Sequence, residues 1–167
     1  MDKRLDYWKV APQGYHALTA IDRYINDSSI ETSLLELVKL RASQVNHCAF
    51  CIDMHWKDAR AAGESEQRLY SLDGWREAPF YTDRECAALA WTESLTLVSE
   101  TGAPDSVYED VRAIFTDKEI VDLTLAISMI NAWNRLSISM RAPVPGTYDP
   151  SLRHKLAPKP AEPAKSD

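Results

Sequence analysis

Residues that break helices are almost absent from the first 142 residues of this chain. Six of the nine prolines lie in the last 25 residues, and the whole sequence contains five glycines. Because proline and glycine mark loops and turns, a long stretch nearly without them favours helices joined by short connections. The sequence therefore predicts an all-α fold, a single helical domain of about six to seven helices.

A change in composition divides the chain into three parts. Residues 1–14 are an irregular lead-in, residues 15–142 carry the helical pattern, and residues 143–167 form a proline-rich tail without a hydrophobic core of its own. We expect the tail either to be disordered or to lie as an extended strap on a neighbour. The length of 167 residues is that of one domain.

Three capping boxes mark where helices are expected to begin. In each, a serine or threonine stands three residues before a glutamate, and the two side chains together satisfy backbone N–H groups in the first helical turn. The pairs are Ser28 with Glu31, Thr82 with Glu85, and Thr116 with Glu119. With the apolar periodicity, they predict helices over 15–26, 28–46, 48–62, 64–72, 82–101, 104–115 and 117–140.

The helix expected at 117–140 is apolar on nearly every side. Such a helix is normally buried all round. A domain of this size has few other helices to surround it. We therefore expect another subunit to cover part of its surface, so that the protein is an obligate homo-oligomer.

Charge and hydropathy argue against several classes of partner. The chain carries 19 Lys and Arg against 25 Asp and Glu, a net charge of −6, without a dense basic cluster. This pattern favours neither nucleic acid nor an anionic membrane surface. Residues 120–138 are apolar but include two asparagines, an aspartate and an arginine, which are too costly for a lone membrane span. We expect no nucleic-acid partner and no membrane association.

The first residues are polar and lack the apolar core of a secretory signal. We therefore expect a cytoplasmic protein, in which cysteines stay reduced. The chain has three cysteines, Cys48, Cys51 and Cys86. In a reducing compartment they point to chemistry or metal binding rather than to structural disulfides.

Cys48 and Cys51 form a CxxC motif, and His55 follows four residues later. On a helix, residues three, four and seven apart share a face, so the two thiols and the imidazole are expected side by side. The spacing suits reversible disulfide formation, and an imidazole can take a thiol proton or stabilise the thiolate. The motif therefore predicts dithiol redox chemistry.

Glu36 lies on the preceding expected helix, on a stripe that leads into the CxxC. If the two helices pack antiparallel, its carboxylate approaches the His55 end of the site. A carboxylate in that position orients the imidazole. The predicted catalytic residues are thus Glu36, Cys48, Cys51 and His55.

Less specific interpretations of the same residues stay open. The two cysteines can be small buried residues, and CxxC with a histidine can bind zinc, although a closed zinc site needs a fourth ligand. Glu36 can pair with Lys39 on a solvated face, and His47 can be an ordinary residue at the start of a helix. Cys86 has no partner nearby in the sequence and is expected to serve packing.

Taken together, the acid, the CxxC and the histidine resemble the alkylhydroperoxidase D family, within the carboxymuconolactone decarboxylase-like superfamily. Their combined spacing is a far more specific signal than the CxxC alone. The resemblance covers residues 15–142 and leaves out the tail. Its motifs lie at Glu36, 41–55, 58–64, 75–82, 87–93 and 131–136.

The resemblance implies an all-helical fold that assembles as trimers or hexamers, and a peroxidase that uses no haem, flavin or metal. It implies that Cys51 is the peroxidatic cysteine and Cys48 the resolving one, with Glu36 and His55 as the proton relay. The implied substrate is a hydroperoxide. The implied reductant is an external dithiol, such as a lipoylated or thioredoxin-like protein.

The chain departs from the family pattern at Phe50, where better-known members carry a histidine. One proton donor or acceptor is missing there, which is expected to weaken or retune the activity. Two other functions stay open. One is a carboxymuconolactone decarboxylase-like enzyme acting on a small cyclic acid, with turnover that survives loss of both cysteines. The other is a non-catalytic redox-sensing or binding oligomer.

Overall fold

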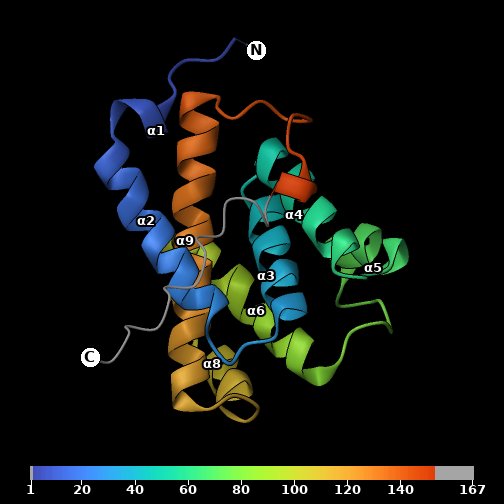
Figure 1. The fold of residues 1–167 in the computed structure, drawn as a ribbon. Coiled ribbons are helices and arrows are strands. Elements are labelled where there is room, and N and C mark those ends of the chain that lie inside the picture. The colour runs from blue at the N-terminus through green and yellow to red at the C-terminus, as the bar shows by residue number, and fades with distance from the viewer. Residues whose placement is uncertain (1, 153–167) are drawn as a thin grey trace, which may run out of the picture.

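The structure, a computed structural model, describes residues 2–152, and all regular elements in that range are helical (Figure 1). The all-α prediction is therefore confirmed. The α-helices are α1 Tyr7–Val10, α2 Pro12–Asn26, α3 Thr32–Val45, α4 Ala49–Ala61, α5 Glu66–Ser71, α6 Asp83–Thr96, α7 Val98–Thr101, α8 Asp105–Arg112 and α9 Asp117–Met140. Two short 3-10 turns are η1 Leu72–Gly74 and η2 Pro150–Leu152.

Helix α3 lies at the centre of the protein. It packs against α4, α6 and α9, and Figure 1 shows it between α9 on one side and α4 with α5 on the other. Nine of its 14 residues are buried, including two that are charged, Glu36 and Lys39. A helix enclosed on so many sides takes polar side chains into the interior, and this places Glu36 in the candidate site.

Two apolar clusters lie on opposite sides of α3. One contains Leu35 and Val38 of α3 and joins them to residues of α2, α6, α8 and α9. The other contains Leu37 and Leu40 and joins them to residues of α4, α5, η1 and α6. Because the apolar residues of α3 face both ways, burial of apolar surface fixes the helix between two layers.

Helix α9 begins and ends at the residues expected from the sequence. Its first turn is closed by the capping box of Thr116 and Glu119, and α6 is likewise capped by Thr82 and Glu85. Val121 on α9 is 57% exposed within the single chain, and Ile138 is 47% exposed. A subunit contact would cover such residues, and homo-oligomerisation remains our prediction.

The capping box expected at Ser28 and Glu31 was predicted wrongly. The helix expected to start at Ser28 begins at Thr32 instead, with Glu31 as its N-cap residue. The Glu31 carboxylate pairs with Arg84 of α6, at 3.2 Å from Nε, and so does not close a box with Ser28. The Ser28 hydroxyl instead accepts a hydrogen bond from the backbone N–H of Ile30.

Other helix boundaries also differ from expectation. Residues 1–14, expected to be an irregular lead-in, contain α1 and the start of α2, because Pro12 suits the first turn of a helix. The helix expected over 82–101 is broken at Leu97 into α6 and α7. Pro104 is the N-cap residue of α8 rather than its first helical residue. The shift at Pro104 lies at a helix end, where local signals fix the boundary least well, whereas the break at Leu97 lies inside the expected helix.

After α9 the chain turns back and lies along α4. Figure 1 shows the segment that ends in η2 beside α4. The backbone N–H of Gly146 donates to Asp53 Oδ2 at 3.2 Å, and Lys57 Nζ donates to the carbonyl oxygen of Tyr148 at 3.1 Å. Residues 143–152, which we call the strap, thus pack on a helix of their own chain. The rest of the predicted tail, 153–167, lies outside the described residues.

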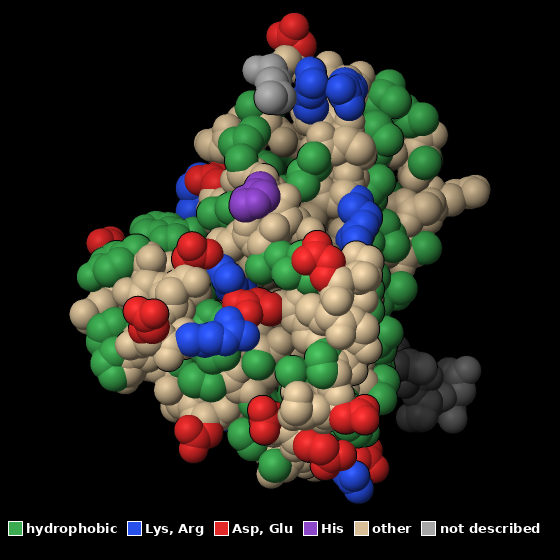
Figure 2. All heavy atoms as spheres, turned by 180° about the vertical axis from the view of Figure 1, so that it is seen from behind, with side chains coloured by type: hydrophobic (Ala, Val, Ile, Leu, Met, Phe, Trp, Pro, Cys, Tyr) green, Lys and Arg blue, Asp and Glu red, His purple; other side chains and the backbone are tan. Residues whose placement is uncertain are grey.

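The surface carries both signs of charge. On the face seen in Figure 2, Lys and Arg side chains are scattered among Asp and Glu, and acidic side chains gather at the end of the molecule that carries α8. Across residues 2–152, no helix is both long and apolar enough to cross a bilayer.

Replacing the cap of the longest described helix gives a test of the fold. Thr116 Oγ1 accepts from the backbone N–H of Glu119, so Thr116→Ala leaves that donor without its partner. We expect the free energy of unfolding to fall by about 1 kcal/mol, measured by urea denaturation. Ser99→Ala, at an exposed position on α7, is the control and should change stability by less than about 0.5 kcal/mol. An equal loss in both variants would contradict the role of the cap.

Candidate active site

The turn between α3 and α4 places the CxxC at a helix N-terminus. His47 has a left-handed backbone, with φ 56°, and this reverses the chain after α3. The backbone N–H of Cys48 then donates to the carbonyl oxygen of Ser43 at 2.9 Å. Cys48 becomes the N-cap residue of α4, and Cys51 is the third residue of that helix. Both sulfurs therefore lie near the positive end of the helix dipole.

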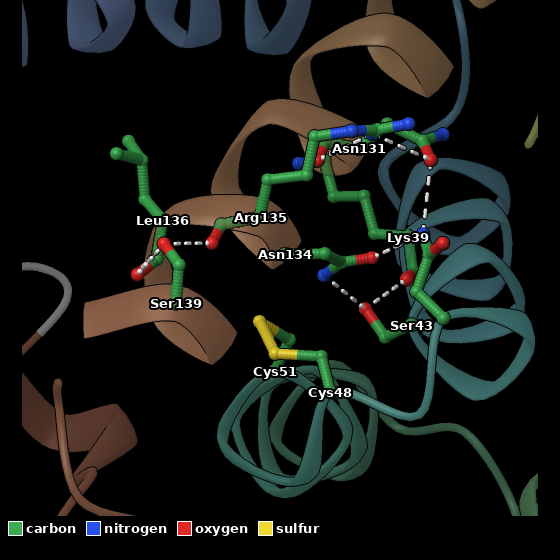
Figure 3. The surroundings of a disulfide bond; sticks show 10 residues. Lys39, Ser43, Cys48, Cys51, Asn131, Asn134, Arg135, Leu136 and Ser139 are labelled. Atoms are coloured by element: carbon green, nitrogen blue, oxygen red, sulfur yellow. Dashed lines mark hydrogen bonds between the residues drawn. A yellow bond between two sulfur atoms is a disulfide. The ribbon is translucent and has the colours of Figure 1, made fainter. Parts of the chain in front are cut away.

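The two cysteines are joined and buried. Cys48 and Cys51 form a disulfide with Cα atoms 5.3 Å apart, and each residue is 1% exposed. In Figure 3 the disulfide lies between α4 and the side chain of Asn134 on α9. The structure thus shows the oxidised form of a dithiol pair that is shielded from bulk solvent within the single chain.

Glu36 and His55 meet across the α3–α4 interface. Glu36 Oε2 lies 2.8 Å from His55 Nδ1, and the two residues are 0% and 5% exposed. A carboxylate accepts only, so Nδ1 is assigned as the donor of this bond, and in a neutral ring Nε2 then presents its lone pair. Nε2 is buried and has no hydrogen-bond partner among residues 2–152. A neutral imidazole in this position can therefore accept a proton at Nε2.

Lys39 lies on the other side of the Glu36 carboxylate. Its Nζ is 3.8 Å from Glu36 Oε1 and donates to Asn26 Oδ1 at 3.2 Å. The pairing of Glu36 with Lys39 foreseen as an alternative is thus present. The solvated face foreseen with it is wrong, because both side chains are buried between helices.

Asp58 and Tyr148 belong to the same cluster, and the sequence analysis missed them. One carboxylate oxygen of Asp58, one of Glu36 and one ring nitrogen of His55 lie within 4.8 Å of one another. The hydroxyl of Tyr148, on the strap, donates to Asp58 Oδ1 at 2.7 Å. Asp58 follows His55 by three residues, a helical spacing that could have identified it. Tyr148 gave no comparable signal.

Carboxylates and an imidazole at these distances are also ligands that a divalent cation uses. Here Nδ1 of His55 is engaged by Glu36, and one oxygen of Asp58 accepts from Tyr148. Hydrogen bonds within the cluster therefore already engage these potential metal-binding atoms. The zinc set considered from the sequence, which used the two sulfurs with His55, competes with the disulfide for the same sulfurs.

An amide and hydroxyl network holds the CxxC turn against α9. Asn134 Nδ2 donates to Ser43 Oγ at 3.1 Å, and Ser43 Oγ donates to the carbonyl oxygen of Lys39 at 2.7 Å (Figure 3). Asn46 Nδ2 donates to the side-chain oxygens of Asn131 and Asn134, at 2.9 Å each. The polar residues that interrupt the apolar sequence of α9 thus anchor the backbone that carries Cys48.

The remaining sequence candidates lie apart from this cluster. His47 is exposed at the turn. Cys86 is a free, half-buried thiol on α6, whose Sγ lies 3.9 Å from the carbonyl oxygen of Tyr81. Burial raises the pKa of the Cys86 thiol, and the carboxylates of Asp83 and Glu85 raise it further. At neutral pH this sulfur is therefore a poor nucleophile.

Comparison with known proteins identifies the family. The model of the carboxymuconolactone decarboxylase family matches residues 12–94. The uncharacterised protein YdfG of Bacillus subtilis strain 168 is 46% identical over 140 residues, which cover 84% of this chain and 95% of YdfG.

Solved structures agree with this assignment. A protein of unknown function from Agrobacterium tumefaciens, proposed to be the antioxidant defence protein AhpD, matches with a TM-score of 0.82 at 45% identity, over 84% of this chain and 97% of that one. A peroxidase-related protein from Ralstonia eutropha JMP134 with an alkylhydroperoxidase AhpD core has a TM-score of 0.71, over 80% of this chain and 72% of that one. Its identity is 17%, so this likeness shows the fold alone. The chain therefore belongs to the carboxymuconolactone decarboxylase family and has the alkylhydroperoxidase D-like fold.

Proposed function

We propose that this protein is a thiol-dependent peroxidase that reduces hydroperoxides with the Cys48–Cys51 pair. One observation carries the proposal. The Glu36 carboxylate lies 2.8 Å from His55 Nδ1 and favours a proton there, while Nε2 is buried without a hydrogen-bond partner among the described residues, on a ring one helical turn from Cys51. The family supports a peroxidase-related or carboxymuconolactone decarboxylase-like function, and the redox pair favours the first.

The proposed reaction starts from the reduced pair. His55 Nε2 takes the proton of the Cys51 thiol, and the thiolate attacks the terminal oxygen of the hydroperoxide. The O–O bond breaks, and the leaving alkoxide takes the proton from His55 and departs as an alcohol. Cys51 is now a sulfenic acid. The Cys48 thiol attacks its sulfur, water leaves, and the disulfide forms.

Reopening the disulfide requires two electrons and two protons from outside the protein. We propose an external dithiol, on a lipoylated or thioredoxin-like protein in a reducing cytoplasm, as their source. A thiolate of that partner would attack one sulfur of the pair and form a mixed disulfide, which its second thiol would resolve. No haem, flavin or metal takes part in the proposed cycle.

A stoichiometric oxidation tests the proposal. The reduced protein receives one equivalent of an organic hydroperoxide, free thiols are blocked, and the cysteines are mapped by mass spectrometry. We expect a rapid Cys48–Cys51 disulfide, one equivalent of alcohol, and Cys86 still free, because its raised pKa keeps that sulfur protonated at neutral pH. Unreacted cysteines, or slow oxidation that includes Cys86, would overturn the proposal.

A further inference from the structure

We propose that Asp58 and Tyr148 are positioning residues of this site, which hold the imidazole of His55 ready to accept the Cys51 proton. The inference deepens the proposed function and rests on the role of His55 as the base. It concerns the strap, which the family model does not reach, since the match ends at residue 94.

The charges around His55 explain why a second carboxylate matters. When His55 takes the thiol proton it becomes an imidazolium, and the Glu36 and Asp58 carboxylates lie within 4.8 Å of one ring nitrogen and of each other. In a buried site, opposite charges at this range stabilise one another more strongly than in water. Lys39 is the positive group on α3 that also faces Glu36. From α9, the uncharged Asn134 lies toward the disulfide (Figure 3).

The strap determines where the Asp58 carboxylate lies. Tyr148 binds α4 at three points: its hydroxyl donates to Asp58, its carbonyl oxygen accepts from Lys57, and its ring meets that of Phe50 edge-on, with centroids 6.4 Å apart. A hydrogen bond to a carboxylate favours the charged form of the carboxylate. Tyr148 thereby fixes the Asp58 carboxylate on the His55 side of α4. Phe50, inside the CxxC, supports the tyrosine ring.

The reactivity of the Cys51 thiol toward iodoacetamide tests this inference without a hydroperoxide. The alkylation rate of Cys51 is measured across pH in reduced protein by mass spectrometry. We expect Tyr148→Phe to slow alkylation at pH 7 roughly fivefold and Asp58→Asn roughly tenfold, with both profiles displaced toward higher pH. The thiolate then forms less readily, because the imidazolium has lost part of its stabilisation.

Tyr24→Phe is the matched control. The Tyr24 hydroxyl donates to the buried carboxylate of Asp122 at 2.8 Å, an equivalent bond between α2 and α9. We expect this variant to lose similar thermal stability and to keep the wild-type alkylation profile. A Tyr148→Phe profile that superimposes on the wild type would reduce Tyr148 to a structural role and overturn the inference.

Repeating the test in a His55→Gln variant separates an effect that acts through the imidazole from a direct effect on the thiol. If Asp58 and Tyr148 act through the imidazole, adding Tyr148→Phe to His55→Gln should change the profile no further. An additional displacement in that double variant would contradict the inference. If Asp58→Asn does not fold, Tyr148→Phe decides alone, since it removes one oxygen atom from a half-buried ring. A wild type inert to hydroperoxide would refute the proposed peroxidase and leave the alkylation test intact.

Discussion

The Cys51→Ser variant is expected to lose peroxide reduction by about 10³-fold or more, because serine cannot supply the nucleophile of the first step. Cys48→Ser should behave differently. Its Cys51 should still react once with hydroperoxide and then stop as a sulfenic acid, since no second thiol closes the disulfide. The measurement is hydroperoxide consumption with an excess of dithiol, combined with trapping of sulfenic acid by a 1,3-diketone.

The asymmetry between the two variants tests the assignment of roles. Cys48 is the N-cap residue of α4 and Cys51 stands in its first turn, so the helix dipole favours the thiolate at both positions. His55 distinguishes them, because it is one helical turn from Cys51 and two turns from Cys48. Cys86→Ser is the control and should retain wild-type turnover. Turnover in Cys51→Ser with none in Cys48→Ser would invert the roles. Turnover without either cysteine would favour a decarboxylase-like enzyme.

Most of the helical architecture could be predicted because its signals are local. The capping boxes at Thr82 and Thr116 work within four residues, and both are present. The box at Ser28 has the same local pattern, yet Glu31 pairs with Arg84, 53 residues away in the sequence. A competing contact of that kind leaves no trace in a local pattern. The break at Leu97 likewise lies inside a continuous helical pattern.

The candidate site divides in the same way. The spacing of Cys48, Cys51 and His55 fixes their shared helix face, so the sequence could place them together. That Glu36 is fully buried depends on apolar clusters on both sides of α3, which form only when the domain folds. Tyr148 contacts Asp58 of α4 from a position 90 residues later in the sequence. Its position depends on the direction of the turn after α9, which the periodicity of the sequence does not predict. The chemical roles of these residues stay predictions until the variants are measured.

Glu36→Gln is expected to slow disulfide formation with hydroperoxide by roughly 10²-fold, the usual contribution of a general base that loses its partner. Glutamine keeps the shape of the side chain and removes its charge, so the imidazolium that forms at His55 loses the carboxylate that stabilises it. The same change leaves Lys39 buried beside a neutral group. Because an unpaired buried charge is costly, we also expect the free energy of unfolding to fall by about 3 kcal/mol.

The double variant Glu36→Gln with Lys39→Met separates these two effects. Methionine removes the unpaired charge and fills the space with an apolar chain, so roughly 1–2 kcal/mol of stability should return. The rate of disulfide formation should remain as low as in Glu36→Gln, because the imidazolium of His55 still lacks a carboxylate partner at this position. Both quantities are measured on the same reduced samples, by urea denaturation and by rapid-quench thiol mapping.

Asp122→Asn supplies the matched control for losing a buried carboxylate. Asp122 is fully buried on α9 and pairs with Lys118, away from the dithiol. This variant should lose stability and keep the wild-type rate of disulfide formation. If it slows the reaction as much as Glu36→Gln does, the rate reports general loosening of the fold. If the double variant at Glu36 and Lys39 regains rate together with stability, Glu36 is a structural residue and the proton relay is refuted. Only a rate that stays low in a restabilised protein assigns Glu36 to the chemistry.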